Sequence, residues 1–411
     1  MGKVLLLGFL AGLLLGCMTA NNVKTLTESG EEQAEYNEDL TRLIIESERL
    51  NQTFRKKGML FNGVEANQYL NDMAAELVPD FHDDRIRVKI YIVKNATPNA
   101  MALPNGDIYV FSGLFAMLNN ESQLASIVAH EIGHVIHQHG LKSAIAARNT
   151  IVAAHIADIF LFGTHLSYLP AGMSLASFSR EQEREADEVS LSYMANTQYD
   201  LNQSPEVFAL FSSLPKSNSV SGSIYSSHPD NEERIEYLSR IISENYSGDD
   251  AGFYESSARF EKTRAQLMEL NVKLRLRSKQ YQMALDLLQE ADAYYEEKTL
   301  ITFYRGEAYR LMAENPVAAA KEEAWLQERK VTEEDKKKHQ DKVAANWDLA
   351  KQYYLEILDL EKAPAETHRG LALVYMNEED KDSAIKHLEI YVNSEGIKDR
   401  LYYTHLLEEL I

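Results

Sequence analysis

Two histidines four residues apart in an apolar stretch constrain the fold of this chain more than any other sequence feature. His130 and His134 belong to the pentapeptide His-Glu-Ile-Gly-His, and residues 124–129 before it are apolar and rich in helix formers. In a helix the two imidazoles project from one face, one turn apart, and can share one metal ion. Glu131 lies beside that face, where it can take a proton from a water molecule at the metal. Such pentapeptides also arise by chance, so the assignment depends on a third ligand elsewhere in the chain.

A catalytic zinc ion needs three protein ligands and one open position. A third histidine that follows the pentapeptide after a glycine break is excluded, because position 137 is histidine and the sixth residue after His134 is Gly140. The other source is a carboxylate on a second helix. Glu183 and Asp187 are four residues apart ahead of a helical run, so one can bind metal while the other accepts the ring N–H of a ligating histidine. The competing interpretation of these two carboxylates is a solvated acidic helix face.

Three further motifs accompany the pentapeptide. Residues 99–114 read NAMALPNGDIYVFSGL, residues 179–187 read SREQEREAD, and residues 228–235 read HPDNEERI. In this order the motifs resemble the family-48 zinc metallopeptidases of the gluzincin group, the HtpX, Oma and BepA type, over roughly residues 85 to 240. The resemblance implies a zinc-dependent enzyme that hydrolyses peptide bonds.

The resemblance also assigns roles to the matching positions. His130, His134 and Glu183 would bind one zinc ion (Zn²⁺) per chain, the cofactor that the resemblance implies. Glu131 would be the general base of the reaction. Asp187 would accept a hydrogen bond from a ligating histidine and so orient its ring.

Two other motif residues keep alternative roles. The resemblance places His228 near the metal, where it would stabilise the oxyanion or cap the open coordination position; the competing role is that of a helix-capping loop histidine. Arg234 would bind the substrate backbone or brace the loop that begins at His228. Of the two histidines close to the pentapeptide, His137 is poorly placed to complete one tetrahedral site with His130 and His134, and His139 is expected to be structural.

Two strands are expected ahead of the pentapeptide. Residues 85–93 alternate charged and apolar side chains, as a half-buried strand does, and residues 106–111 read as a second strand that runs into the helix of the pentapeptide. In the family that the chain resembles, such an edge strand pairs with an extended peptide, which gains affinity through backbone groups. Gly106 is therefore a candidate substrate-binding position.

The N-terminus resembles a bacterial lipoprotein signal. Lys3 precedes a short apolar run at residues 4–15, far below the ~20 residues of a membrane-spanning helix. The run ends in Leu-Leu-Gly-Cys, and Cys17 is the only cysteine of the chain. We expect cleavage before Cys17 and lipid attachment to it; a plain signal peptide is the alternative. Met18 in place of aspartate favours the outer membrane, so the predicted location is the periplasm of a Gram-negative bacterium, with a lipid anchor.

The chain is strongly acidic. Its formal net charge of −21, from 63 acidic and 42 basic residues, argues against nucleic acid as a partner, since nucleic-acid binders present basic patches. The same charge offers no polybasic patch for a membrane surface. Contact with a membrane would therefore depend on the lipid at Cys17.

At 411 residues the chain has room for two domains. After a polar, glycine-containing gap, alanines recur at the 34-residue period of tetratricopeptide repeats, namely Ala284 with Ala318 and Ala350 with Ala384. A generic helical bundle is the alternative. The predicted fold is α+β and mostly α: a zincin-type peptidase domain with a small β-sheet, followed by an α-helical tetratricopeptide-like solenoid. The predicted segments are a lipoprotein signal peptide with its lipobox (1–17), a tether (18–38), the zinc metallopeptidase domain (39–245) and the helical repeat domain (253–411).

Two functions of different classes follow from these features. The first is a zinc-dependent endopeptidase of the cell envelope that cleaves misfolded or unassembled proteins, with the repeats recruiting substrates or the outer-membrane assembly machinery. The second is a periplasmic chaperone or outer-membrane assembly factor whose proteolytic activity is mostly latent, with His228 holding the site closed. The intact Glu131 and ligand set favour the enzyme.

Overall fold

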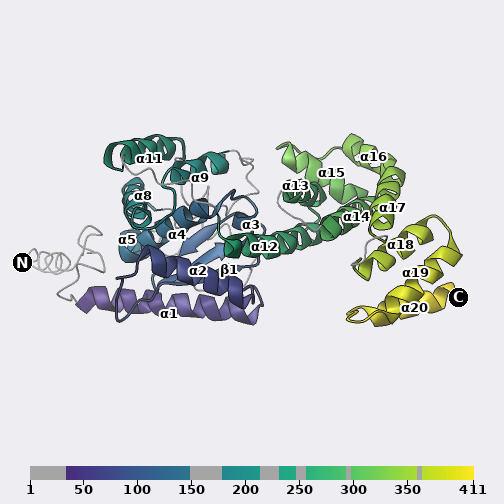
Figure 1. Ribbon diagram of the computed structural model, residues 1–411, viewed down its shortest axis with the longest axis horizontal. Helices are drawn as coiled ribbons and strands as arrows, with labels where there is room; N and C mark the ends of the chain where they lie inside the picture. The colour runs from purple at the N-terminus through teal and green to yellow at the C-terminus, as the bar shows by residue number, and fades with distance from the viewer. Residues whose placement is uncertain (1–33, 149–177, 213–230, 247–255, 293–297, 359–362) are drawn as a thin grey trace, which may run out of the picture. The chain divides into compact units, whose positions relative to one another are not determined.

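The computed structural model describes residues 34–148, 178–212, 231–246, 256–292, 298–358 and 363–411. These residues are mostly helical with one small β-sheet, which confirms the predicted α+β, mostly α class (Figure 1). The structure divides into two compact units, Met1–Thr263 and Arg264–Ile411. The division falls inside helix α12 (Ala258–Arg277), whereas the sequence places the domain boundary near residues 245–253, most of which lie outside the described residues. The limits of the predicted segments stay a prediction.

The sheet of the first unit has three strands in the order β1-β3-β2. β1 (Lys89–Val93) runs parallel to β3 (Asp107–Phe111), and β2 (Ala100–Ala102) pairs with β3 in antiparallel orientation. Both predicted strands are present, although the first begins at Lys89 and not at residue 85. β3 is the central strand, so the expectation that it is an edge strand is wrong. The edge strand beside the helix of the pentapeptide, α4 (Glu121–Ile136), is β2, and a short helix, α3 (Ser112–Phe115), separates β3 from α4.

Gly106 forms the turn between β2 and β3. Its φ is +89°, and a Cβ atom there would lie 2.4 Å from the carbonyl oxygen of Arg87, so a larger residue would strain the turn. The Gly106 N–H donates to the carbonyl of Leu103 (2.9 Å), and its carbonyl accepts from the N–H of Lys89 (3.0 Å). The structure gives Gly106 a conformational role, which by itself accounts for glycine at this position.

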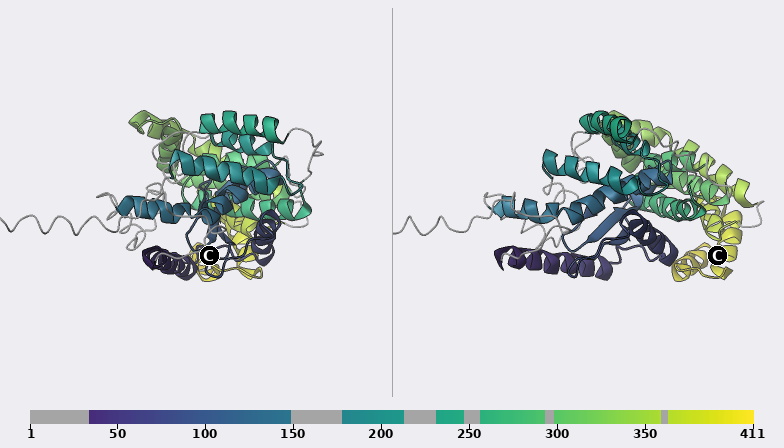
Figure 2. Two further views of the ribbon diagram at one scale, coloured as in Figure 1. Left: turned by 90° about the vertical axis from the view of Figure 1, so that its left-hand side faces the viewer. Right: turned by 60° about the vertical axis from the view of Figure 1, so that its left-hand side comes forward.

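Helices cover the sheet on both faces. In the right-hand view of Figure 2, α1 (Ala34–Lys56) lies below the sheet, and the helices of the first unit drawn in blue and teal lie above it. On the α1 side, Phe54 and Leu60 pack in one apolar cluster with Tyr109 of the central strand. α2 (Val64–Leu77) packs against β1 and α4, and all 16 residues of α4 are buried, including its charged and polar ones. Buried polar groups need partners, so the side chains around α4 decide what its polar residues can do.

The remaining helices of the first unit bring the two halves of the site together. Gly133 of α4 faces Ala186, and a Cβ atom on Gly133 would lie 3.2 Å from the Ala186 carbonyl oxygen. This close approach places the helix that carries Glu183 and Asp187, α8, against the pentapeptide on α4. The helices concerned are α5 (His139–Arg148), α8 (Arg180–Met194), α9 (Gln203–Ser212) and α11 (Asn231–Asn245).

The described residues of the second unit form helices joined by turns, without a strand. Three of the four alanines in the predicted repeat are fully buried (Ala284, Ala350 and Ala384), whereas Ala318 is half-buried. The assignment of these helices to tetratricopeptide repeats stays a prediction. Within the described ranges, no helix combines the length and the apolar composition that crossing a bilayer requires. The helices after α12 are α13 (Tyr281–Ala291), α14 (Lys298–Glu314), α15 (Pro316–Leu326), α16 (Glu333–Asp341), α17 (Val343–Leu358), α18 (Glu366–Asn377), α19 (Lys381–Asn393) and α20 (Arg400–Leu410).

Candidate metal centre

The three predicted zinc ligands meet at one point between α4 and α8. His130 Nε2 lies 3.0 Å from His134 Nε2, and the two nitrogens lie 3.4 and 3.6 Å from the carboxylate oxygens of Glu183. All three side chains are buried. A tetrahedral zinc ion with bonds of 2.0–2.1 Å separates its ligand atoms by about 3.3 Å. The spacing and the chemistry of these donors therefore fit one zinc ion.

The start of α8 explains why Glu183 points into the site. The Ser179 hydroxyl accepts from the backbone N–H of Gln182 while the Gln182 side chain accepts from the backbone N–H of Ser179, which is a capping box. The cap fixes the first turn of α8, and Glu183 follows it with its N–H donating to the Ser179 carbonyl (2.9 Å). The serine of the SREQEREAD motif thus has a local structural function.

Asp187 lies where the sequence predicts it, against the outer nitrogen of a ligating histidine. His130 presents Nε2 to the other ligands, so its Nδ1 carries the proton and donates to Asp187 Oδ1 at 2.9 Å. The Tyr237 hydroxyl also donates to the Asp187 carboxylate. Asp187 is 2 % exposed, so these contacts take place away from water.

Arg234 binds the carboxylates of the site. Its guanidinium donates to Asp187 through Nε (2.8 Å) and Nη2 (2.6 Å), and Nη1 lies 3.1 Å from Glu183. The guanidinium also stacks on Phe208, 4.0 Å from the ring centroid, and the side chain is 3 % exposed. Of the two roles left open for Arg234, this arrangement favours bracing, although what it braces is the pair of carboxylates.

The charges of this cluster hold one another in the ionised state. Burial alone would raise the pKa of the Asp187 carboxyl, but the charge of Arg234 and the hydrogen bond from His130 outweigh it, so the pKa lies below its usual value. Burial alone would lower the pKa of Arg234, and the charge of Asp187 outweighs it in turn. Glu131, fully buried on α4, adds a third carboxylate whose charge acts on Arg234. Burial alone would lower the pKa of His130, but its hydrogen bonds with Asp187 and Glu183 outweigh it and raise the pKa to about 9, so without metal both Arg234 and His130 lie as cations among the three carboxylates.

Two polar residues next to the ligands were not predicted to act on the site. His139 Nδ1 lies 2.8 Å from His134 Nδ1, and His139 Nε2 lies 2.9 Å from Glu185 Oε2. Burial lowers the pKa of His139 to about 4, so its ring is neutral. Burial would raise the pKa of Glu185, but the hydrogen bonds from His139 and His137 outweigh it and lower the pKa to about 2. The contact arises because Gln138 has a φ of +54°, which turns the chain back after α4.

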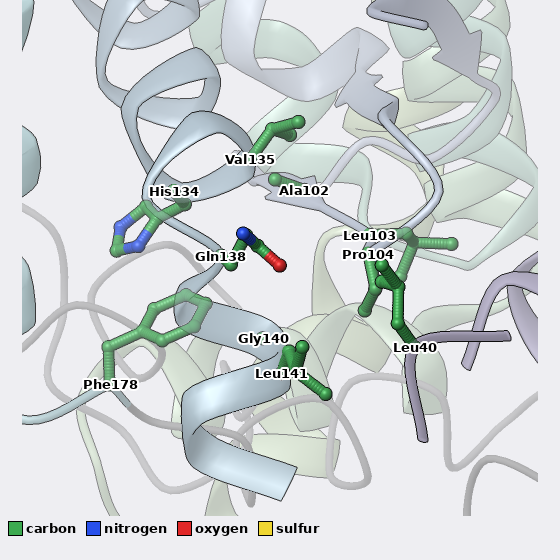
Figure 3. A pocket seen from close by; sticks show the side chains of 10 residues that line it. All are labelled: Leu40, Ala102, Leu103, Pro104, His134, Val135, Gln138, Gly140, Leu141 and Phe178. Carbon is green, nitrogen blue, oxygen red and sulfur yellow. The ribbon is translucent and has the colours of Figure 1, made fainter. Parts of the chain in front are cut away.

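A mostly apolar pocket adjoins the site at His134 (Figure 3). Phe178 stacks on the His134 ring with 3.9 Å between ring centroids and an interplanar angle of 19°. The polar atoms that Figure 3 draws around the opening belong to His134 and Gln138. The lining residues come from α1, from β2 and the turn after it, from the end of α4, from the turn between α4 and α5, from α5, and from the segment just before α8. They are Leu40, Ala102, Leu103, Pro104, His134, Val135, Gln138, Gly140, Leu141 and Phe178.

Two predicted site residues lie outside the described residues. They are His228, whose role near the metal stays a prediction, and Cys17, the predicted lipid attachment site. Both assignments therefore stay predictions. The whole predicted signal peptide (1–17) and most of the predicted tether (18–38) also lie outside the described residues.

A buried helix with two histidines one turn apart, completed by a glutamate from a second helix, defines a metallopeptidase of the gluzincin type. Residues 65–242 match peptidase family M48, and the chain carries a peptidase domain of this family. The recognition of the family from the sequence motifs is therefore confirmed.

The chain is similar in sequence to several proteases. The chain is 27 % identical over 161 residues to mitochondrial metalloendopeptidase OMA1 of Schizosaccharomyces pombe, covering 39 % of this chain and 48 % of the relative. It is 24 % identical over 193 residues to the beta-barrel assembly-enhancing protease of Escherichia coli, covering 44 % of this chain and 40 % of the relative. The protein of the same name in Yersinia pestis is 29 % identical over 153 residues, 34 % of this chain and 31 % of the relative. The chain thus spans half or less of the length of these relatives.

Proposed function

We propose that this protein is a zinc-dependent endopeptidase of the bacterial cell envelope that cleaves misfolded or unassembled proteins. The observation that carries the proposal is the convergence of His130, His134 and Glu183 on one point, with Glu131 on the same buried helix. The names of the Escherichia coli and Yersinia pestis relatives, which refer to assembly of beta-barrels, support a function in the envelope.

Each residue of the site has a part in this reaction. Zinc held by the two histidines and Glu183 would lower the pKa of a water molecule to about 7 and polarise the scissile carbonyl. Glu131 takes the proton of the attacking water and returns it to the departing amine. Asp187 holds the His130 ring with Nε2 towards the metal, and Arg234 keeps the Asp187 and Glu183 carboxylates in place.

The outer edge of β2 is the proposed binding site for the substrate backbone. Asn99 and Leu103 bond to β3, so the N–H and C=O groups of Ala100 and Ala102 point to the opposite edge. An extended peptide that pairs there would run beside α4, and Ala102 also lines the apolar pocket next to His134. Pairing through backbone groups carries little sequence preference, which suits unfolded segments as substrates.

The other parts of the chain would place and supply this enzyme. Lipid on Cys17 would anchor it in the periplasm, on the outer membrane of a Gram-negative bacterium. The helical second unit, with its proposed tetratricopeptide-like repeats, would recruit unfolded envelope proteins or the outer-membrane assembly machinery. The 34-residue spacing of alanines and the lipobox-like Leu-Leu-Gly-Cys sequence support these two proposals.

A second function, a chaperone or assembly factor with mostly latent proteolysis, is favoured by one observation. His130 and His134 are 6 % and 2 % exposed, and Glu131 is fully buried. Little of these side chains is accessible from solvent, so cleavage would require a more open site. In this alternative, His228 would keep the site closed, and the chain would act mainly by binding.

Zinc content and casein hydrolysis, measured on the full chain beside Glu131→Gln, test the proposal. We expect zinc in both proteins and cleavage only in the parent, because glutamine keeps the size of glutamate but cannot take a proton. Zinc in both without cleavage in either would support the latent alternative. Equal cleavage by the parent and the variant would exclude Glu131 as the base.

A further inference from the structure

The ring nitrogens of His134 have fixed tasks. Nε2 faces His130 Nε2 and Glu183, so this is the nitrogen that would bind the proposed metal. A neutral imidazole has one N–H and one acceptor nitrogen, so His134 must carry its proton on Nδ1. That proton points at His139 Nδ1, 2.8 Å away.

The proton on His134 fixes the tautomer of the next ring. His139 Nδ1 must accept, so the proton of His139 is on Nε2, which donates to Glu185 Oε2 at 2.9 Å. Glu185 is itself held, since its other oxygen lies 2.7 Å from His137 Nδ1 and Lys142 Nζ lies 3.6 Å from Oε2. Every hydrogen bond from His134 to Glu185 thus has a donor and an acceptor.

The packing around His139 keeps this arrangement in one geometry. His139 is completely buried, and its backbone carbonyl accepts from the Gln182 side chain (3.4 Å). Phe178 stacks on the face of the His134 ring. Neither imidazole can rotate without displacing a packed aromatic ring or breaking a hydrogen bond.

We propose that His139 and Glu185 are positioning residues that orient His134 for zinc and fix its tautomer; this inference rests on the proposed metal site. Both ligating histidines then depend on a carboxylate of α8. His130 reaches Asp187 directly, whereas Glu185, two residues further round the helix from Glu183, points about 200° away from it. The His139 ring bridges that distance.

A second metal ion is the competing use of the same side chains. The ligand atoms of His137, His139 and Glu185 all lie within 4.8 Å of one another. A metal there would have to displace the His139 Nε2 proton, and the Lys142 ammonium 3.6 Å from Glu185 opposes a further cation. The relay of hydrogen bonds is therefore the better account, and a second metal becomes an outcome of the test.

The test is the zinc affinity of the full chain, measured by competition with a chelator. His139→Leu should weaken zinc binding by about 10- to 100-fold, the usual effect of losing the partner of a ligating histidine. His139→Asn, whose side-chain oxygen can accept from His134 Nδ1, should recover most of that loss. In the cobalt-substituted protein, the visible absorption of His139→Leu should differ from that of the parent, and that of His139→Asn should resemble the parent.

His387 provides a matched control. Its Nδ1 lies 2.8 Å from His368 Nδ1 in the second unit, so His387→Leu breaks the same kind of imidazole pair away from the metal site. This variant should keep the zinc affinity of the parent even where it lowers stability. If His139→Leu does not fold, Glu185→Gln takes its place, with an expected loss on the order of tenfold.

Three results would overturn the inference. One is parental zinc affinity in His139→Leu or, in its place, in Glu185→Gln. Another is a loss in His139→Asn as large as in His139→Leu, which would indicate general disruption. The third is binding of two zinc ions by the parent and one by His139→Leu, which would establish a second metal site. Casein hydrolysis by the parent, measured in parallel, reports separately on the proposed function, because zinc affinity does not depend on turnover.

Discussion

Arg234→Met measures how much the buried guanidinium contributes to the stability of the first unit. Methionine keeps an apolar stem over Phe208 but removes the guanidinium that donates to Asp187 and lies 3.1 Å from Glu183. Both carboxylates are at most 4 % exposed, so water can solvate them only slightly once the guanidinium is removed. Breaking a buried ion pair by removing one partner costs about 3–5 kcal/mol. We expect a loss of this size, a large share of the about 5–15 kcal/mol by which domains are stable.

The control variant removes an arginine from an exposed ion pair between the same two helices, α8 and α11. Arg184 of α8 lies 2.8 Å from Glu233 of α11, with side chains 55 % and 50 % exposed. Exposed pairs contribute about 0–1 kcal/mol, so Arg184→Met should change stability by no more than that. The two variants remove the same chemical group at similar distances and differ in burial.

Urea unfolding of both variants, with zinc and with a chelator, measures the two effects. The relevant transition is the one that zinc shifts. The loss of stability in Arg234→Met should be larger without zinc. No metal charge then lies beside the carboxylates of Glu131, Glu183 and Asp187, so their interaction with the guanidinium of Arg234 matters more. A loss within 1 kcal/mol of that in Arg184→Met would refute the reasoning.

Three other predictions concern acid, packing and metal. Burial would raise the pKa of Glu307, but the charges of Arg310 and Arg369 outweigh it and lower the pKa to about 2. This carboxylate therefore stabilises the second unit above its unfolded pKa of about 4.3 and loses that effect as the pH falls towards 2, so Glu307→Gln should flatten acid unfolding in this window; an unchanged acid profile would contradict the prediction. Gly370→Ala should cost about 1–3 kcal/mol, because its Cβ would lie 2.4 Å from the Tyr354 ring, and urea unfolding should show a smaller cost in a Tyr354→Leu background, whereas equal costs in both backgrounds would exclude the contact. Free zinc at a hundred times its Kd should stabilise the first unit by about 2.7 kcal/mol, so calorimetry that shows no shift on chelation would argue against the metal site.

Sequence patterns predict those parts of the fold and the site that depend on local spacing. His130 and His134, like Glu183 and Asp187, are four residues apart on helices, and helical geometry alone places each pair on one face. The strands β1 and β3 have a recognisable apolar pattern. β2 has three residues, too few for a pattern, and its position at the sheet edge depends on its pairing with β3.

Contacts between distant helices are the part that spacing could not predict. Arg234 binds Asp187 and Glu183 because α11 packs beside α8, and the sequence left its role open. His139 reaches Glu185 across 46 positions of the chain, and only the left-handed turn at Gln138 brings it back to the site. Gln138 is not a glycine, so nothing in its residue type indicated that turn.

The most direct test of the proposed zinc peptidase is to measure bound zinc and casein hydrolysis on the same samples of the parent, Glu183→Ala and Glu181→Ala. Glu181 lies on the same helix as Glu183 but is exposed, so it controls for removal of a carboxylate from α8. The parent and Glu181→Ala should each hold one zinc ion and cleave casein, and Glu183→Ala should lose both properties together. Full zinc content and full cleavage in Glu183→Ala would contradict the assignment of Glu183 as the third ligand, and with it the site on which the proposed function depends.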